Sequence, residues 1–142
     1  MKRGGIVRYQ ILVVEDQEEI RSIVEKYLIK EGYNVLMAKD GFEALDIFNT
    51  NTIHLVLLDI MMPGIDGFEV LEEFRHVSEV PVIMLTAKQE EIDRIKGFKT
   101  GVDDYVVKPF SVKELMLRIK RLIKRVYHEA EDGIKRQLNW IN

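Results

Sequence analysis

Five short apolar runs, each followed by a segment of helical periodicity, most constrain the fold of this 142-residue chain. The runs are rich in valine, isoleucine and leucine and do not alternate with polar residues. This pattern is typical of strands that are buried on both faces of a parallel sheet. The runs are Ile11–Val14, Val35–Ala38, Leu55–Leu58, Val82–Leu85 and Tyr105–Val107.

Segments with the spacing of amphipathic helices lie between and after the runs. The first four predicted helices are Glu18–Lys30, Ala44–Phe48, Phe68–Phe74 and Glu90–Lys99. Gly32 is a natural stop after the first of them. In the last helix, Ser111 and Glu114 have the spacing of a capping box, and an apolar stripe runs from Val112 to Val126.

Strict alternation of strands and helices predicts right-handed crossovers and helices on both faces of the sheet. We therefore expect an α/β, doubly wound domain of five strand–helix units over residues 8–126. The polar segment 127–142 could extend the last helix, begin a linker or be an addition to the natural chain, and the sequence does not decide among these.

Composition narrows the classes of function. A net charge of −3, from 21 Lys and Arg against 24 Asp and Glu, argues against a basic nucleic-acid-binding module. The chain has no cysteine, which excludes a disulfide scaffold, a thiolate metal site and a cysteine nucleophile. No apolar run approaches the roughly 18 residues of a membrane span, and residues 1–10 lack a secretory signal. We expect a soluble, cytoplasmic domain with no membrane partner.

Polar residues stand where the predicted strands end. In an open α/β sheet, ligands bind beyond the carboxyl ends of the strands. The residues at these ends are Glu15, Asp16, Asp59, Thr86 and Lys108. Three have a simpler alternative: Asp16 has capping-box spacing to Glu19, Thr86 could be an ordinary strand-end residue, and Lys108 could be a surface ion-pair partner. Asp59 is harder to explain structurally, because a carboxylate among other acids is repelled by their charge. The joint placement of these residues at four strand ends favours a functional site.

Clustered carboxylates without a histidine or cysteine partner are typical of a hard divalent cation, and Mg²⁺ fits best. The three histidines His54, His76 and His128 are scattered without ligand spacing, and the turn after the first run has no glycine-rich phosphate loop. With Mg²⁺, Asp59 would be the nucleophile of a phosphoryl transfer, Lys108 would neutralise charge and Thr86 would donate a hydrogen bond. The sequence leaves the isomer of the Lys108–Pro109 bond open, and a cis bond would fix the approach of the lysine.

These residues lie in stretches that resemble a known family. The chain is similar to the receiver domain of two-component response regulators over nearly all of residues 8–126. The matching stretches are Ile11–Asp16 (ILVVED), Leu57–Gly67 (LLDIMMPGIDG), Met84–Ala87 (MLTA) and Gly101–Phe110 (GVDDYVVKPF). The resemblance implies a flavodoxin-like fold whose five parallel strands follow the order 2-1-3-4-5.

The resemblance also implies individual roles. Asp59 would be the phospho-acceptor, receiving the phosphoryl group from a sensor histidine kinase, and Lys108 would contact the phosphate. Mg²⁺ would be bound by Glu15, Asp16, Asp59 and the Met61 backbone carbonyl; Glu15 stands where many members have aspartate. Thr86 and Tyr105 would be the switch residues. Such a domain is a signalling switch and not a metabolic enzyme, because it catalyses only its own phosphorylation and dephosphorylation.

The segment Val102–Phe110 and the helix after it look like the OmpR/PhoB class of transcription regulators. In that class, active receivers form homodimers through the face made by the fourth helix, the fifth strand and the fifth helix. The implied cross-subunit ion pairs are Arg94 with Glu114, Asp104 with Arg118, and Asp103 with Lys120 or Arg121. The simpler interpretation is a solvated helix face, since exposed pairs contribute only about 0–1 kcal/mol each.

Two alternatives concern the output and the reaction. DNA binding would need on the order of 100 further residues, so we expect either the receiver of a longer regulator or a stand-alone receiver that acts through protein contacts. A Mg²⁺-dependent phosphohydrolase of the haloacid-dehalogenase type would need a second aspartate two residues after the nucleophile, where this chain has Met61. A receiver-like module that no longer accepts phosphate is disfavoured because every expected functional residue is present.

Overall fold

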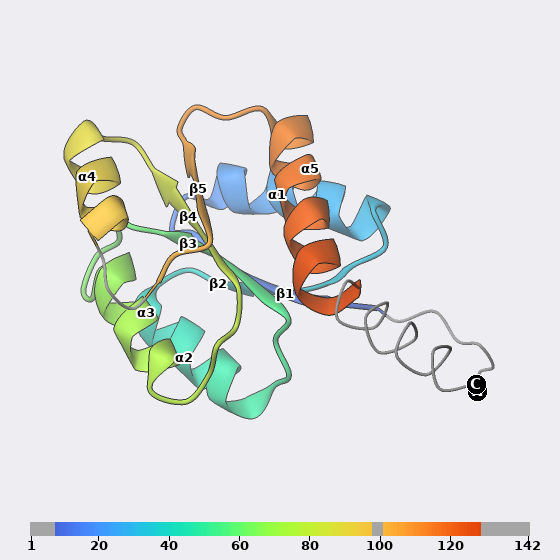
Figure 1. The fold of residues 1–142 in the computed structure, drawn as a ribbon, viewed down its shortest axis with the longest axis horizontal. Helices are drawn as coiled ribbons and strands as arrows, with labels where there is room; N and C mark the ends of the chain where they lie inside the picture. The colour runs from blue at the N-terminus through green and yellow to red at the C-terminus, as the bar shows by residue number, and fades with distance from the viewer. Residues whose placement is uncertain (1–7, 98–100, 129–142) are drawn as a thin grey trace, which may run out of the picture.

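The computed structural model describes residues 8–97 and 101–128, and shows a parallel five-stranded sheet with helices on both faces (Figure 1). The order of the strands is β2-β1-β3-β4-β5, and every neighbouring pair is parallel. This confirms the predicted doubly wound fold and its strand order. The strands are β1 (Gln10–Val14), β2 (Asn34–Ala38), β3 (Leu55–Asp59), β4 (Val82–Thr86) and β5 (Asp104–Val107).

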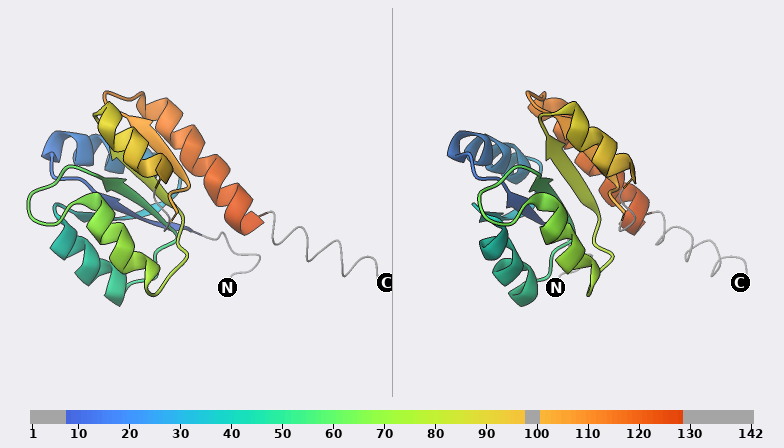
Figure 2. Two further views of the ribbon diagram at one scale, coloured as in Figure 1. Left: turned by 60° about the vertical axis from the view of Figure 1, so that its left-hand side comes forward. Right: turned by 90° about the vertical axis from the view of Figure 1, so that its left-hand side faces the viewer.

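The helices form two layers around the sheet. Helices α1 and α5 pack on one face, while α2, α3 and α4 pack on the other (Figures 1 and 2). Successive side chains of a strand point to opposite faces, so Leu12 and Val14 of β1 belong to one core cluster and Ile11 and Val13 to the other. The helices are α1 (Glu18–Lys30), α2 (Gly41–Thr50), α3 (Gly67–Arg75), α4 (Gln89–Gly97) and α5 (Val112–Ile123), followed by a π-helical turn, η1 (Lys124–His128).

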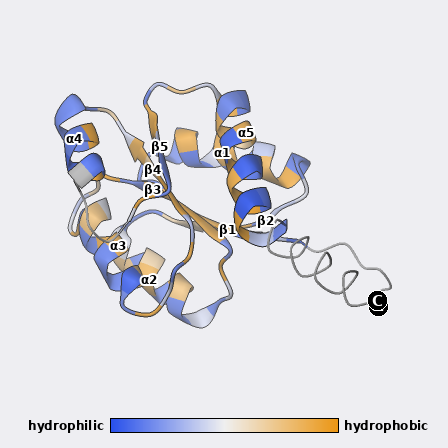
Figure 3. Ribbon diagram, in the orientation of Figure 1, coloured by the Kyte–Doolittle hydropathy of each residue, from blue (hydrophilic) through white to orange (hydrophobic). Residues whose placement is uncertain are grey.

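The central strands are apolar along their whole length, as predicted for strands covered on both faces. The side chains of β3 and β4 are all buried, and Figure 3 shows the sheet mainly in the hydrophobic colours. Helix α5, in contrast, carries both hydrophilic and hydrophobic residues along its length. Its buried stripe covers the β1–β3–β4 centre of the sheet together with α1.

N-terminal caps make two helices begin earlier than predicted. The Asp40 side chain accepts a hydrogen bond from the Glu43 backbone N–H at 2.8 Å, so α2 begins at Gly41 and not at Ala44. Asp66 and Glu69 form a reciprocal capping box at the start of α3. These caps lie upstream of the apolar spacing, and for that reason periodicity alone predicted both helices too short.

The end of α5 differs from the prediction. The apolar stripe does not reach Val126, which is 36% exposed, because the wider π-helical turn rotates the chain after Ile123. Tyr127 packs against the core instead: its hydroxyl donates to the His54 carbonyl at 2.6 Å and its ring stacks on Tyr9.

The capping box predicted at the start of α5 is replaced by a single cap. The Ser111 side chain accepts from the Glu114 N–H at 3.3 Å, while the Glu114 carboxylate pairs with Arg118 at 3.6 Å. Most of the predicted extension 127–142 lies outside the described residues, as do Phe98 and Lys99 at the predicted end of α4. Within the described part of the chain, no helix is both long and apolar enough to cross a membrane.

Candidate functional site

The carboxyl ends of four strands meet at one edge of the sheet. The register pairs Val14 of β1 with Leu58 of β3, and Asp59 of β3 with Leu85 of β4. Residues that follow these strands are therefore neighbours in space although they lie far apart in the sequence. The five predicted strand-end residues come together at this edge.

Three carboxylates form the centre of the site. One oxygen from each of Glu15, Asp16 and Asp59 lies within 4.8 Å of the others. Glu15 and Asp59 are buried and Asp16 is exposed, so the cluster opens to solvent on one side. Gln17, not Asp16, is the N-cap of α1 and makes no side-chain cap bond, so the capping alternative for Asp16 is not realised. An all-oxygen donor set with an open side fits a hard cation such as Mg²⁺, which keeps several of its waters.

Lys108 places one positive charge against this cluster. Its Nζ lies 2.8 Å from Glu15 Oε1 and 3.3 Å from Asp59 Oδ2. The backbone holds the lysine in position: its N–H donates to the Thr86 carbonyl at 2.7 Å, and the Lys108–Pro109 bond is cis. One ammonium cannot balance three carboxylates, which leaves room for a further cation.

The pKa values follow from this charge imbalance. Burial, and after it the charge of Glu15, raise the pKa of Asp59 to about 7, against the opposing effect of Lys108. Burial alone would lower the pKa of Lys108, but its hydrogen bond to Glu15 and the charges of Asp59 and Glu15 outweigh that effect and raise it. The lysine thus stays charged, whereas Asp59 needs a cation nearby to stay fully ionised at neutral pH.

Thr86 is buried at the end of β4, where its hydroxyl donates to Glu91 Oε1 of α4 at 2.5 Å. The same Glu91 oxygen accepts from the Ala87 backbone N–H at 3.1 Å. Sequence reasoning missed Glu91. The available signal was its position on the apolar face of α4, next to Ile92 and four residues before Ile95, both of which are buried.

A glycine brings the start of α3 against the end of β3. A Cβ on Gly67 would lie 2.6 Å from the Asp59 carbonyl oxygen and 2.9 Å from the Ile60 Cα, both backbone atoms. The Gly67 N–H donates to the Ile60 carbonyl at 2.9 Å. Glycine is therefore required here for close approach, and this contact fixes the backbone that carries Asp59.

With this geometry in place, comparison with known proteins decides the family. Residues 11–120 match the sequence profile described as "Response regulator receiver domain". The chain belongs to this family.

Solved receiver structures agree with the assignment. The receiver domain of Francisella response regulator 1452 is 37% identical, with a TM-score of 0.77 over 84% of this chain and 99% of that one. TrrA from Thermotoga maritima, in complex with Mg²⁺ and BeF, is 38% identical, with a TM-score of 0.71 over 80% and 98% of the two chains. The non-phosphorylated HemR receiver domain from Leptospira biflexa is 32% identical, with a TM-score of 0.74 over 82% and 94%.

The resemblance implies two further residues, Tyr105 and Met61. Tyr105 of β5 is half-buried and packs against the core cluster that contains Leu58 and Met84. Met61 follows Asp59 by two residues in the β3–α3 connection, and its side chain is 52% exposed. The roles of Tyr105 in switching and of the Met61 carbonyl in metal binding stay predictions.

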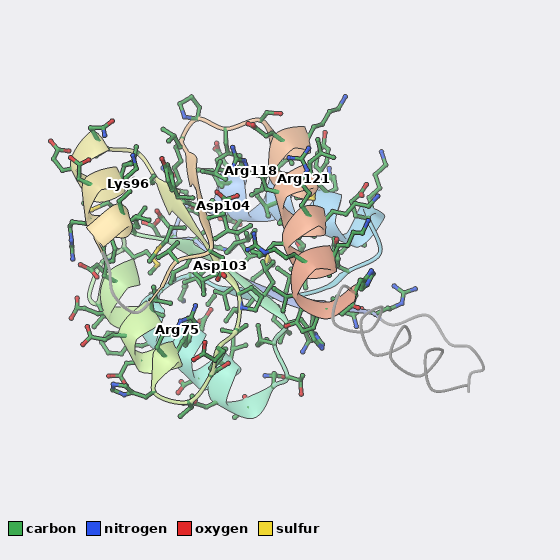
Figure 4. All side chains as sticks on the ribbon, in the orientation of Figure 1. Arg75, Lys96, Asp103, Asp104, Arg118 and Arg121 are labelled. Carbon is green, nitrogen blue, oxygen red and sulfur yellow. The ribbon has the colours of Figure 1, made fainter. Side chains whose placement is uncertain are left out.

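Several of the acids and bases expected at the dimer face form ion pairs within one receiver. Arg118 Nη1 lies 2.9 Å from both carboxylate oxygens of Asp104, and Figure 4 shows the two side chains between β5 and α5. Asp103 accepts from the Val82 N–H at 2.8 Å and lies 3.8 Å from Arg75.

Arg94 and Glu114 are not paired with each other in the single receiver. Arg94 lies 4.0 Å from Asp66 and sits over the Phe68 ring, while Glu114 pairs with Arg118. Lys120 and Arg121 are exposed. Of the predicted interface residues, Arg94 lies on α4, Asp104 begins β5 and Asp103 directly precedes it, and Glu114, Arg118 and Arg121 lie on α5. Lys120, also on α5, instead lines a groove with Tyr27 of α1. Their role in a dimer stays a prediction.

Proposed function

We propose that this receiver domain accepts a phosphoryl group on Asp59 from a sensor histidine kinase, in a reaction that depends on Mg²⁺. The observation that carries the proposal is the joint placement of Glu15, Asp16 and Asp59 with Lys108 in ion-pair contact and Thr86 buried nearby. Such a domain is a switch whose chemistry acts only on itself.

Glu15, Asp16 and Asp59, with the Met61 carbonyl, would hold Mg²⁺. When bound, the ion would supply positive charge to neutralise the oxygens of the transferring phosphoryl group. An Asp59 carboxylate oxygen forms the new bond to phosphorus as the bond from phosphorus to the kinase imidazole breaks, and the released nitrogen keeps the electron pair and takes up a proton. Lys108, already 3.3 Å from Asp59, stabilises the negative oxygens of the transferred group.

Two further observations support this assignment. TrrA, 38% identical, has been solved with Mg²⁺ and BeF, and this chain has a cluster of three carboxylates that suits such a cation. Beside Lys108 runs a mostly apolar groove of about 350 Å³, lined by Ile20 and Ile23 of α1 and by Phe110. A kinase helix presenting its phosphohistidine at Asp59 would cover this groove.

The output we propose is transcription regulation in the OmpR/PhoB manner. Phosphorylation would promote a homodimer through α4, β5 and α5, and DNA would be bound by a further domain outside this chain. The Asp104–Arg118 pair would then be shared with the partner subunit. A kinase partner of this kind places the domain in the cytoplasm.

The test is phosphorylation by a small donor. We expect acetyl phosphate with Mg²⁺ to add the mass of one phosphoryl group to the wild-type chain, and a chelator to prevent it. Asp59→Asn abolishes the addition, while Asp46→Asn, which removes an exposed acid on α2, leaves it unchanged. Equal labelling of Asp59→Asn and the wild type would overturn the site assignment, and sustained turnover of ordinary phosphomonoesters would favour the phosphohydrolase.

A further inference from the structure

Glu91 is an acidic residue on the apolar side of α4. Glu91 is only 5% exposed, and Ile92 and Ile95 on the same helix are buried as well. One carboxyl oxygen accepts two hydrogen bonds, from the Thr86 hydroxyl and from the Ala87 N–H. The other oxygen, Oε2, is buried and has no hydrogen-bond partner among the described residues.

This arrangement is costly for a side chain with only a structural role. A buried polar atom without a partner costs about 1–3 kcal/mol, and a helix face that needed only packing would carry an apolar residue here. Glu91 is therefore expected to have a partner whose position matters. That partner is Thr86, 1% exposed, whose hydroxyl has a single proton to donate.

We propose that Glu91 is a positioning residue that holds the Thr86 hydroxyl on α4 in the resting receiver and competes for it with the phosphoryl group on Asp59. This inference rests on the proposed function. In the resting state the Thr86 hydroxyl lies 2.5 Å from Glu91 Oε1 and 3.3 Å from the Lys88 carbonyl oxygen, so Glu91 is the nearer acceptor of its single proton. A phosphoryl oxygen can gain that proton only when the bond to Glu91 is broken.

The competition gives the site a direct connection to α4. When the Thr86 hydroxyl turns away from Glu91, Oε1 keeps only its hydrogen bond from the Ala87 N–H. Oε2 already lacks a partner among the described residues, so the buried carboxyl group then accepts a single hydrogen bond. The buried position of Glu91 is then less stable, which favours movement of the first turn of α4. Phosphorylation and the Thr86–Glu91 bond are thus opposing contributions to one equilibrium.

The decisive experiment is a double-mutant cycle on the affinity of the full chain for beryllofluoride with Mg²⁺, measured by titration calorimetry. We expect Glu91→Ala to bind the phosphoryl mimic about tenfold more tightly than the wild type, the size of one lost hydrogen bond to an ionisable group. Glu91→Gln, which keeps a weaker acceptor, gives a smaller gain in the same direction. The matched control is Glu90→Gln, which removes an exposed acid from the same turn and leaves the affinity unchanged.

Thr86→Val separates positioning from a structural role. Without the hydroxyl there is nothing for Glu91 to hold, so Glu91→Ala has no effect on the affinity in the Thr86→Val background. An equal gain in both backgrounds, or no gain in the wild-type background, would overturn the proposal. If Glu91→Ala does not fold, Glu91→Gln carries the same comparison. Failure of the wild type to bind the mimic would contradict the proposed function instead.

Discussion

At the scale of single residues, the site is a balance of charges that the chain does not complete by itself. Three carboxylates and one lysine make a cluster with a net negative charge. Burial and the repulsion between such like charges raise the pKa of a carboxyl group. Asp59 shows this effect, with its pKa raised to about 7. The residue that must act as a nucleophile is thus the one that most needs a cation.

This leads to a prediction for the metal-free protein. The pKa of Asp59 is about 7 in the folded state, against an ordinary value of about 3.8 in the unfolded chain. Between pH 3.8 and 7 the folded state therefore binds more protons than the unfolded state. The free energy of unfolding of the protein thus falls as pH rises through that window. Asp59→Asn has no carboxyl group to ionise here, so its free energy of unfolding does not fall in this way. By pH 7–8 it is expected to exceed that of the wild type by on the order of 2–4 kcal/mol.

The measurement is urea unfolding at several pH values in a chelating buffer, with the exposed Asp46→Asn as the control. A constant difference between Asp59→Asn and the wild type across the pH range would show that Asp59 is not destabilised by its surroundings. Added Mg²⁺ is expected to reduce the advantage of the variant, because the ion favours the ionised Asp59.

Residue identity at the strand ends was predictable, whereas the hydrogen-bond partners were not. Glu15, Asp59, Thr86 and Lys108 each follow an apolar strand, and parallel topology brings such positions together whatever the details of packing. Glu91 depends instead on how α4 lies against β4. Helical spacing places Glu91 on the apolar side of α4, but it does not indicate that this residue reaches the Thr86 hydroxyl.

At the scale of elements, the connections after the strands determine the geometry of the site. The β3–α3 connection returns to its own strand end, where the Gly67 N–H bonds to the Ile60 carbonyl. The β4–α4 connection is held by the Thr86–Glu91 bond. Both connections follow strands that carry site residues, so changes there reach the site directly.

We predict that Gly67→Ala destabilises the protein by roughly 1–3 kcal/mol and slows phosphorylation of Asp59. The added methyl group would meet the Asp59 carbonyl oxygen at 2.6 Å, and backbone cannot move aside as a flexible side chain can. Gly32→Ala is the matched control: Gly32 has a φ of 96° but no atom within 4 Å of the added carbon. It should lose stability without any change in the phosphorylation rate.

The comparison is made by denaturant unfolding together with the rate of labelling by acetyl phosphate. If Gly67→Ala reacted as fast as the wild type, the close approach of α3 would not matter for the position of Asp59. A slower reaction in Gly32→Ala would mean that lost stability alone explains the effect.

The sequence predicted which strands and helices form better than it predicted where the helices begin and end, and the reason is physical. The strands are defined by burial, which apolar runs report directly, and all five lie within one residue of their predicted ends at each side. Helix starts depend on side-chain caps such as Asp40 and Asp66, which lie outside the apolar spacing. The π-helical turn after Ile123 depends on the packing of Tyr127 against Tyr9 and His54, residues far away in the sequence.

At the scale of the whole molecule, the candidate site lies at one edge of the sheet, and the proposed dimer face lies on α4, β5 and α5. Charged side chains of both signs lie on α4, at the start of β5 and on α5, among them Lys96, Asp104 and Arg118 (Figure 4). Arg118 and Asp104 already pair within one receiver, so dimerisation must exchange ion pairs more than create them. Such exchange suits a weak interface that a small conformational change can switch.

We predict that beryllofluoride with Mg²⁺ shifts this receiver toward a dimer, and that Arg121→Glu prevents the shift. Arg121 is exposed and lines a groove with Asp103 and Asp104, so reversing its charge adds repulsion at the face. Lys113→Glu is the matched control, because Lys113 lines a different groove with Tyr27 of α1.

Analytical ultracentrifugation with and without the mimic measures the effect. Dimerisation of Arg121→Glu as strong as that of the wild type would exclude Arg121 from the interface. Loss of dimerisation in Lys113→Glu alone would place the interface on the α1–α5 side.

The most direct test of the central claim is to identify chemically which residue carries the phosphoryl group. After reaction with acetyl phosphate and Mg²⁺, borohydride reduces an aspartyl phosphate to homoserine, which tandem mass spectrometry locates in the sequence. We predict homoserine at position 59 alone, and none when Mg²⁺ is chelated. Homoserine at position 16 or elsewhere, or its absence from a fully folded and Mg²⁺-treated protein, would contradict the account.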